Sequence, residues 1–506
     1  MQFLLWYAAL YLLMFLLVRF MHLYIWTPLR IQHHFKKQGI TGPGYRVLIG
    51  STGEIKRMYA EAQSKPTSFH PNAVLQKAIP YYYQWSRMYG KTFLYWFGSK
   101  PRLAVSDPYI IREALVKTNS SFEKIEFSPI AKLLFAQGLT GLKGVKWAIH
   151  RRMANEAFYM ERIKGGVLEV AASTTKMLEK WEESRGRKEE FEVEVNKDLH
   201  DLLADVLSKT IFGGSFEERK RIWVLQDQHL DLFTQAARSV YIPGFRFLPT
   251  RNNRLRWRLE KETRELIRAL VKTNTKLETS SMSLLSFLTS SYKNHNGEEA
   301  ALPVEEVVDE CKSFYFVGKE TTANLITWAL LLLASNQDWQ NNAREEIIDV
   351  CCVSGIPSAA NLKDLKIMNM ILNETLRLYS PIVLLQRETT QKMKIGDLDV
   401  PANTELFLAV AAAHHDTETW GEDADKFNPL RFQASQKGIP PIFPFGLGPR
   451  NCIGQNQAIY VAKHVLAMII KDYSFATSPT YVHSPHLLIS IRPQFGAPIL
   501  FTKIQK

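Results

Sequence analysis

One segment near the C-terminus has the residue types and the spacing of a reactive site. It contains the pattern F-x-x-G-x-R-x-C-x-G, and it reads Phe443-Pro444-Phe445-Gly446-Leu447-Gly448-Pro449-Arg450-Asn451-Cys452-Ile453-Gly454. By composition, a chance match in this chain is expected roughly 3 times in 100,000. Glycines allow a tight loop whose backbone can approach a flat ligand, and a lone cysteine there can bind a metal as its thiolate. Arg450 can pair with an anionic group of the same ligand. We interpret the other cysteines, Cys311, Cys351 and Cys352, as inert.

A second candidate site lies in the long helical pattern from Val304 to Ser335, within Val317-Gly318-Lys319-Glu320-Thr321-Thr322. A glycine inside a helix costs about 1 kcal/mol relative to alanine, so Gly318 indicates a position where a side chain would obstruct something. The Thr321 hydroxyl can bond to a carbonyl one turn earlier and locally open the helix. Beside it, Glu320 is suited to moving protons. The alternative is an ordinary threonine on an amphipathic helix.

Two shorter patterns place charged residues on helices. Trp147 and Arg151 are one turn apart, and arginine suits the binding of a carboxylate. Glu374 and Arg377 have the i, i+3 spacing at which side chains meet. Alone, such a pair is an ordinary surface contact worth about 0.3–0.5 kcal/mol. Taken singly, Trp147 is a packed aromatic residue.

The elements that must position these residues are mainly helices. Helical patterns cover 167–184, 200–212, 216–238, 253–277, 304–335, 337–350 and 362–379, and strand-like patterns cover 93–105, 393–409 and 486–501. We find no internal repeat and no linker between residues 50 and 506. The sequence therefore predicts one large helix-dominated domain with small β-sheets at its edge.

Composition restricts the setting. The chain has 506 residues with 46% hydrophobic and 22% charged, which excludes disorder and a coiled-coil rod. Its four cysteines are too few for a disulfide scaffold, which indicates a reducing compartment. The formal net charge of +13 suits nucleic acid, anionic lipid or an acidic protein, and charge alone does not choose among them.

The N-terminus has the composition of a membrane anchor. An apolar run from Phe3 to Val18 continues, broken by Arg19 and His22, to Trp26, which is about the length that crosses a bilayer. Basic residues follow the run, so the positive-inside rule places the rest of the chain in the cytosol. We expect an anchor at residues 1–26, a basic and Gly/Pro-containing hinge at 27–50, and the functional domain at 51–506. A buried core helix is the weaker alternative.

The cysteine loop resembles that of the cytochrome P-450 superfamily, the haem-thiolate monooxygenases, at every fixed position. The resemblance implies a mainly α cytochrome P-450 fold and haem b, with its iron on the Cys452 thiolate. It implies that Phe445 and Gly446 support the loop, and that Trp147, Arg151, Arg387 and Arg450 contact the cofactor. Arg431 completes a structural triad with Glu374 and Arg377, although Leu430 replaces the glutamate that usually precedes this arginine.

The same resemblance assigns the oxygen chemistry to the long helix. Gly318 leaves space above the haem, and Thr321 orders a water and delivers protons, with Glu320 connecting it to solvent. Val317 stands where the family usually has alanine or glycine, so we expect it to narrow the substrate's approach. The implied substrate pocket is apolar and is formed by Phe314, Val317, Ile382, Val383 and Phe495.

The resemblance also predicts partners and location. Details of the motifs are similar to a plant clan of hormone-inactivating, iridoid and triterpenoid oxidases, which suggests a hydrophobic, terpenoid or steroid-like substrate. The implied partners are O2, a separate NADPH-cytochrome P-450 reductase and membrane lipid, with no nucleic acid. The implied location is the endoplasmic reticulum membrane. Two alternatives remain open: a haem-thiolate isomerase or dehydratase, and a non-enzymatic haem-binding protein.

Overall fold

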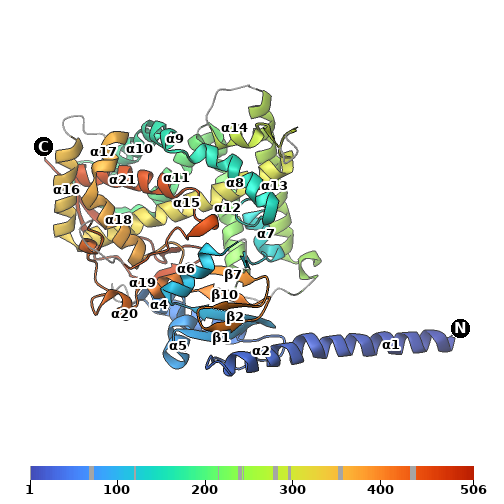
Figure 1. The fold of residues 1–506 in the computed structure, drawn as a ribbon. Helices are drawn as coiled ribbons and strands as arrows, with labels where there is room; N and C mark the ends of the chain where they lie inside the picture. The colour runs from blue at the N-terminus through green and yellow to red at the C-terminus, as the bar shows by residue number, and fades with distance from the viewer. Residues whose placement is uncertain are drawn as a thin grey trace.

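The computed structural model describes residues 2–67, 73–118, 121–214, 216–237, 242, 244–276, 283–293, 298–351, 357–433 and 440–505. Helices make up most of the body, and the largest sheet lies on the side next to the N-terminal helix (Figure 1). The mainly helical fold with small sheets is therefore as the sequence predicts.

The helices that carry or surround the candidate residues follow the chain from end to end. They are α1 (Gln2–Met21), α2 (Thr27–Lys36), α3 (Thr52–Ser64), α4 (Ala73–Ala78), α5 (Pro80–Tyr89), α6 (Pro108–Val116), α7 (Pro129–Phe135), α8 (Gly144–Asn155), α9 (Met160–Gly165), α10 (Val167–Arg185), α11 (Val195–Phe212), α12 (Phe216–Ala237), α13 (Arg251–Lys276), α14 (Leu284–Thr289), α15 (Val304–Ser335), α16 (Gln337–Cys351), α17 (Ala359–Asp364), α18 (Lys366–Leu378), α19 (Val410–His414), α20 (Thr417–Trp420) and α21 (Gln455–Asp472).

The largest sheet combines strands from both halves of the chain in the order β1-β2-β10-β7-β3. These strands are β1 (Thr92–Phe97), β2 (Lys100–Val105), β10 (Glu405–Leu408), β7 (Leu385–Thr389) and β3 (Phe122–Glu123). A second sheet has the order β11-β14-β4, with bounds Tyr473–Thr477, Pro498–Lys503 and Glu190–Glu194. The pairs β5-β6 (Tyr292–Lys293, Glu299–Ala300), β8-β9 (Met393–Ile395, Leu398–Val400) and β12-β13 (Pro485–Leu487, Ile491–Pro493) are two-stranded.

Helix α15 runs through the core. From Leu325 to Ala334 every residue is buried, because the helix is apolar on all sides there and packs among α11, α18 and α21. Its bounds agree with the helical pattern in the sequence. The pattern at 362–379 differs, since it is divided into α17 and α18 at Leu365, whose backbone is not helical.

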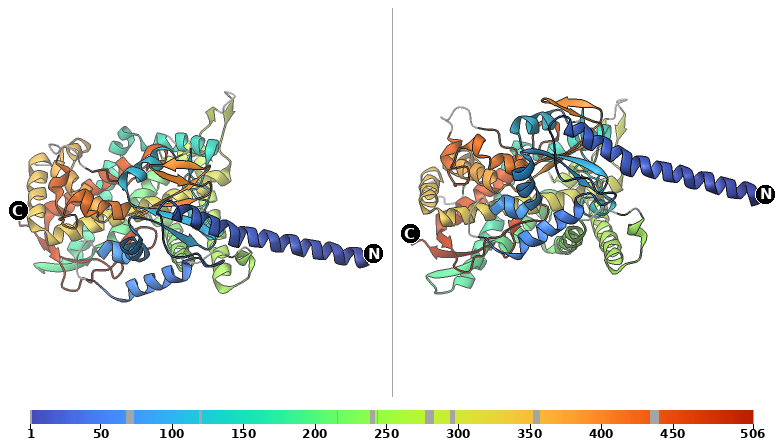
Figure 2. Two further views of the ribbon diagram at one scale, coloured as in Figure 1. Left: turned by 60° about the horizontal axis from the view of Figure 1, so that its bottom comes forward. Right: turned by 90° about the horizontal axis from the view of Figure 1, so that it is seen from below.

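The N-terminal helix extends further than the anchor predicted at residues 1–26. A helix of 34 residues, Phe3–Lys36, has the length and composition to cross a membrane, and its most apolar window is not buried in the protein. Helix α1 projects away from the body in all three views (Figures 1 and 2). A π-helical turn, His22–Trp26, joins α1 to α2 without a break.

Helix α2, within the segment 27–50 expected to form a hinge, packs on the body. Phe35 is fully buried, and Gln38 exchanges hydrogen bonds with the backbone of Asp399. The Gly/Pro stretch that follows is held against β1, because the Leu94 amide donates to the Thr41 carbonyl (3.0 Å). This hydrogen bond ties the start of the segment to the edge of the sheet.

Candidate active site

A buried cavity brings together residues from most of the candidate motifs. Its lining comes from α8, α11, α15, α18, β7, α21 and the cysteine loop. Twelve predicted site residues line it: Trp147, Arg151, Phe314, Val317, Gly318, Thr321, Ile382, Arg387, Phe445, Gly446, Arg450 and Cys452. Side chains far apart in the sequence thus share one space.

The cysteine loop is a compact turn. The Cys452 amide donates to the Phe445 carbonyl (2.8 Å), which closes the loop on itself. Gly446 has φ +68°, a conformation that favours glycine. A Cβ at Gly448 would lie 2.6 Å from the Leu115 carbonyl oxygen, so this glycine serves the close packing of the loop on α6.

Burial raises the pKa of the Cys452 thiol, against the opposing effects of the Gly454 amide and the nearby charges of Arg151 and Lys124. A buried thiol of this kind keeps its proton until a cation replaces it. The donor set therefore fits a metal that supplies its own positive charge at the sulfur.

Four cationic side chains, Lys124, Arg151, Arg387 and Arg450, line the same cavity. Burial and the neighbouring charges of the three arginines lower the pKa of Lys124 to about 7. Burial and the charge of Arg450 likewise lower the pKa of Arg387 to about 10, against the attraction of Glu123. Burial and mutual repulsion thus outweigh the protein's own anions, so the cavity favours an anionic ligand.

Each arginine is held by protein contacts that leave its position well defined. Arg151 donates to the backbone oxygen of Asn451 (2.8 Å) and to its side-chain oxygen (3.0 Å). Arg450 lies over the Trp147 ring at 4.0 Å and donates to the Leu142 carbonyl (2.8 Å). These contacts fix α8 against the cysteine loop and orient the cations before any ligand binds.

On α15 the Thr321 hydroxyl donates to the Val317 carbonyl at 2.8 Å, as the sequence pattern predicts. The helix is nevertheless continuous from Val304 to Ser335, so the bond does not open it in this structure. A Cβ at Gly318 would lie 3.1 Å from Leu207 of α11. The absence of a Cβ at Gly318 therefore leaves room for Leu207, and both residues line the cavity.

Three predicted residues are not among the cavity-lining residues in the described part of the chain. Glu320 is buried on a different side of α15, where it contacts His200. Val383 follows Ile382 in the chain and packs into the main core. Phe495 is 54% exposed, in the turn between β13 and β14, and lies outside the lining of this cavity.

The triad residues are brought together away from the cavity. Arg377 donates twice to Glu374, at 2.7 Å each, and both side chains are fully buried. Arg431 lies 3.6 Å from the Glu374 carboxylate. The pair is thus an interior ion pair rather than the surface contact that its spacing alone would suggest.

Sequence reasoning missed Lys124 and the apolar wall contributed by α11, which includes Leu203, Val206 and Leu207. Neither belongs to a recognisable motif. For Lys124, the signal in the sequence was a lysine close to the apolar residues Phe122 and Ile125. For α11, nothing in the sequence pattern distinguishes the residues that face the cavity.

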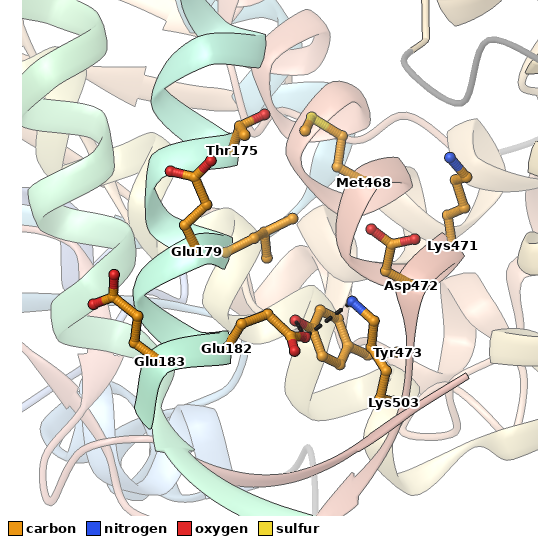
Figure 3. A pocket seen from close by; sticks show the side chains of 10 residues that line it. Thr175, Glu179, Glu182, Glu183, Met468, Lys471, Asp472, Tyr473 and Lys503 are labelled. Atoms are coloured by element: carbon orange, nitrogen blue, oxygen red, sulfur yellow. Dashed lines mark hydrogen bonds and ion pairs between the residues drawn. The ribbon is translucent and has the colours of Figure 1, made fainter. Parts of the chain in front are cut away.

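A second hollow, of about 520 Å³, is larger than the 280 Å³ of the cavity. It lies at the surface between α10 and the end of α21, and Figure 3 shows its Glu182 bonded to Tyr473 and Lys503. Its Glu182 and Lys503 form an ion pair, and no cysteine is among its lining residues in the described chain. The smaller cavity is the one with reactive groups.

Comparison with known proteins identifies the class. The family model for cytochrome P450 matches residues 73–493. The chain belongs to the cytochrome P450 family. It is therefore an oxidoreductase of the haem-thiolate monooxygenase class, with haem iron as its cofactor.

The similar proteins are plant enzymes. Cytochrome P450 734A6 of Oryza sativa subsp. japonica is 40% identical over 497 residues, which cover 94% of this chain and 92% of the relative. Cytochrome P450 734A1 of Arabidopsis thaliana is 40% identical over 505 residues, covering 96% and 95%. Cytochrome P450 CYP72A219 of Panax ginseng is 37% identical over 491 residues, covering 94% of each.

Proposed function

We propose that this chain oxidises a hydrophobic, terpenoid or steroid-like molecule in the cavity described above, where the Cys452 thiolate would hold the haem iron. The observation that supports it most directly is that Cys452, Thr321 and the four cations line one buried space. Bound haem supplies the activation of O2 and the insertion of one oxygen atom into a C–H bond.

The four cationic side chains of the cavity would bind the haem. Arg151, Arg387 and Arg450, with Lys124, are suited to its two propionates, because planar guanidinium groups bind carboxylates in two parallel hydrogen bonds. Pairing with those carboxylates would relieve the repulsion that lowers the pKa of Lys124 and of Arg387. Phe445 and Gly446 shape the loop around the sulfur.

The apolar side chains orient the substrate and exclude water. Phe314, Val317 and Ile382 line the cavity, and Phe314 stacks on Phe158 with ring centroids 5.7 Å apart. An apolar wall binds a hydrophobic molecule by removing its surface from water, and it fixes which carbon is presented. The Val317 side chain narrows the cavity beside Thr321, because both residues lie on the cavity side of α15.

Thr321 carries the proton chemistry on the cavity wall. Its hydroxyl donates to the Val317 carbonyl, so its oxygen lone pairs remain available to accept a hydrogen bond from a water in the cavity. An ordered water there can pass a proton through the hydroxyl, with Glu320 as the acidic group behind it.

The sequence also supports a proposal for the location of the protein and for its source of electrons. We propose that the N-terminal apolar helix anchors the protein in the endoplasmic reticulum membrane with the body in the cytosol, because Arg19, Arg30, Lys36 and Lys37 follow the apolar run. Electrons come from NADPH through a separate reductase. The net charge of +13 suits an acidic docking face on that partner.

The test uses two cysteine variants in membranes. Cys452→Ser should abolish the thiolate-type carbon-monoxide difference spectrum of the reduced protein, whereas Cys311→Ser should keep it, because Cys311 is buried but lies in α15 away from the loop. Wild-type protein with a reductase, NADPH and a panel of terpenoids and steroids should give oxygenated products. A normal thiolate spectrum in Cys452→Ser would remove Cys452 from the site, and the absence of any oxygenated product across the panel would contradict the proposed substrate class.

A further inference from the structure

A buried row of polar side chains follows one face of α15. Glu320, Asn324 and Thr327 are spaced i, i+4 and i+7, and their exposed fractions are 2%, 0% and 0%. Opposite them, α11 presents Asn196 and His200, also one turn apart. Buried polar groups are costly unless they are hydrogen-bonded, so the pairing of these two helices is specific.

Both oxygens of Glu320 are occupied. Oε1 accepts hydrogen bonds from Asn324 Nδ2 (3.1 Å) and Ser490 Oγ (3.1 Å). Ser490 in turn accepts from Asn324 Nδ2 (2.7 Å), so its own hydrogen is directed to Glu320. Oε2 lies 3.2 Å from His200 Nε2.

The partners of His200 determine where its protons are. Nδ1 lies 2.7 Å from the Asn196 carbonyl oxygen, and a carbonyl can only accept, so Nδ1 carries a hydrogen. A neutral imidazole would then present the lone pair of Nε2 to a carboxylate oxygen, which is repulsive. The contact is favourable only if one further proton lies between Nε2 and Oε2.

Glu320 is the ionised member of this contact. Burial would raise the pKa of Glu320, but the hydrogen bond and charge of His200, with the charges of Arg492 and Lys319, lower it to about 2. The His200 side chain is 15% exposed, whereas that of Glu320 is 3% exposed. His200 is therefore the member of the pair that solvent reaches.

We propose that His200 is a positioning residue that holds one transferable proton against Glu320, directly behind Thr321. In the transfer, the Nε2–H bond breaks with its electron pair remaining on the ring, and an O–H bond forms at Glu320 Oε2. Both partners are then neutral. Rotation of the protonated side chain carries the proton to the Thr321 side of α15, and a proton from bulk water restores the imidazolium.

The location of the proton can be measured without any substrate. The reduced carbon-monoxide complex of the full-length protein, labelled with ¹⁵N in its histidine rings, is diamagnetic, and the His200 signals are those lost in His200→Gln. We expect both ring nitrogens of His200 to be protonated at pH 7, and Nε2 to lose its proton in Glu320→Gln. A bare Nε2 at pH 7 in the wild-type protein would overturn the proposal.

The consequence for coupling rests on the proposed function and has a matched control. His200→Gln keeps a hydrogen-bond donor but has no proton to transfer, so we expect product per NADPH to fall about 10- to 100-fold and hydrogen peroxide to rise, with the haem content retained. His415→Gln removes a buried ring with the same kinds of partner, the Leu378 carbonyl (2.9 Å) and the Asp425 carboxylate (3.1 Å), and should leave the ratio unchanged.

The two proposals fail in different ways. Wild-type coupling in His200→Gln, in a preparation where Thr321→Ala is uncoupled, would refute the role of His200 and leave the monooxygenase site intact. Equal uncoupling in His415→Gln would show a general effect of stability and would also refute it. A wild-type protein that yields no oxygenated product contradicts the proposed function, and the ring-nitrogen measurement still decides whether the proton is there.

Discussion

Replacing Arg377 by methionine tests whether the buried triad stabilises the fold. The substitution keeps a long side chain but removes both hydrogen bonds to Glu374 and the donors to the carbonyls of His414 (2.8 Å) and Ala424 (2.6 Å). Removing one partner of a buried ion pair costs about 3–5 kcal/mol. Each buried carbonyl that loses its donor adds about 1–3 kcal/mol.

The loss is therefore roughly 5–11 kcal/mol, which is comparable to the whole stability of an ordinary domain, about 5–15 kcal/mol. We expect little folded haem protein from Arg377→Met, and an intermediate amount from Arg377→Lys, which keeps the charge but cannot reach Glu374 with two parallel bonds. The assay is the carbon-monoxide difference spectrum per mass of protein, together with the urea midpoint of whatever folds.

The matched control is Lys164→Ala. Lys164 and Glu161 form an ion pair with the same i, i+3 spacing, 3.9 Å apart, but the two side chains are 47% and 83% exposed. An exposed pair contributes about 0–1 kcal/mol, so the midpoint should hardly move. If Arg377→Met were as stable as Lys164→Ala, burial would not be the reason that the triad matters.

Three further outcomes are expected. Phe314→Ala should change which position of a substrate is oxidised, whereas Phe495→Ala should not, and product analysis by mass spectrometry decides; a change with Phe495→Ala alone would return that residue to the pocket. Gly448→Ala should lose haem, because its Cβ would meet the Leu115 carbonyl oxygen at 2.6 Å, whereas Gly53→Ala places its Cβ in open space and should retain haem. The pKa of Glu182 is lowered to about 2, because hydrogen bonds from Tyr473, Lys503 and Arg185 outweigh burial, which raises it. Its ionised form therefore stabilises the fold above pH 4.5 and this contribution is lost as the pH falls through about 2, so Glu182→Gln should be less stable at pH 7, by under about 1 kcal/mol, and equal to wild type near pH 2 in urea unfolding.

The sequence predicts long helices well and side-chain directions poorly. The bounds of α15 agree because a helical pattern of that length, without proline inside it, is too long for a strand. By contrast, β4 was missed although Glu190-Phe191-Glu192-Val193-Glu194 alternates, because its partner β14 lies some three hundred residues later in the chain. The residues of a short segment do not indicate which distant strand it will pair with.

In the candidate site, too, residues that belong to a local motif could be predicted, whereas residues that depend on distant parts of the chain could not. Motif residues such as Cys452, Arg151 and Thr321 reach the cavity because their spacing on one loop or one helix face fixes their direction. Phe495 does not, since in a turn one residue more or less reverses the side chain. Lys124 was missed because its importance comes from three arginines on other elements, which only the folded chain brings near it.

Because α1 continues into α2 without a break, the N-terminal apolar helix is joined rigidly to the body. Because Phe35 and Gln38 fix α2 in the body, the body cannot swivel freely about a linker at the membrane surface. With α1 in a bilayer as proposed, its tilt would be transmitted through the π-helical turn at His22–Trp26 and would set the angle at which the body meets the lipid. A truncation meant to keep that body intact should end within this turn, since removing residues 27–50 would take buried side chains out of the core.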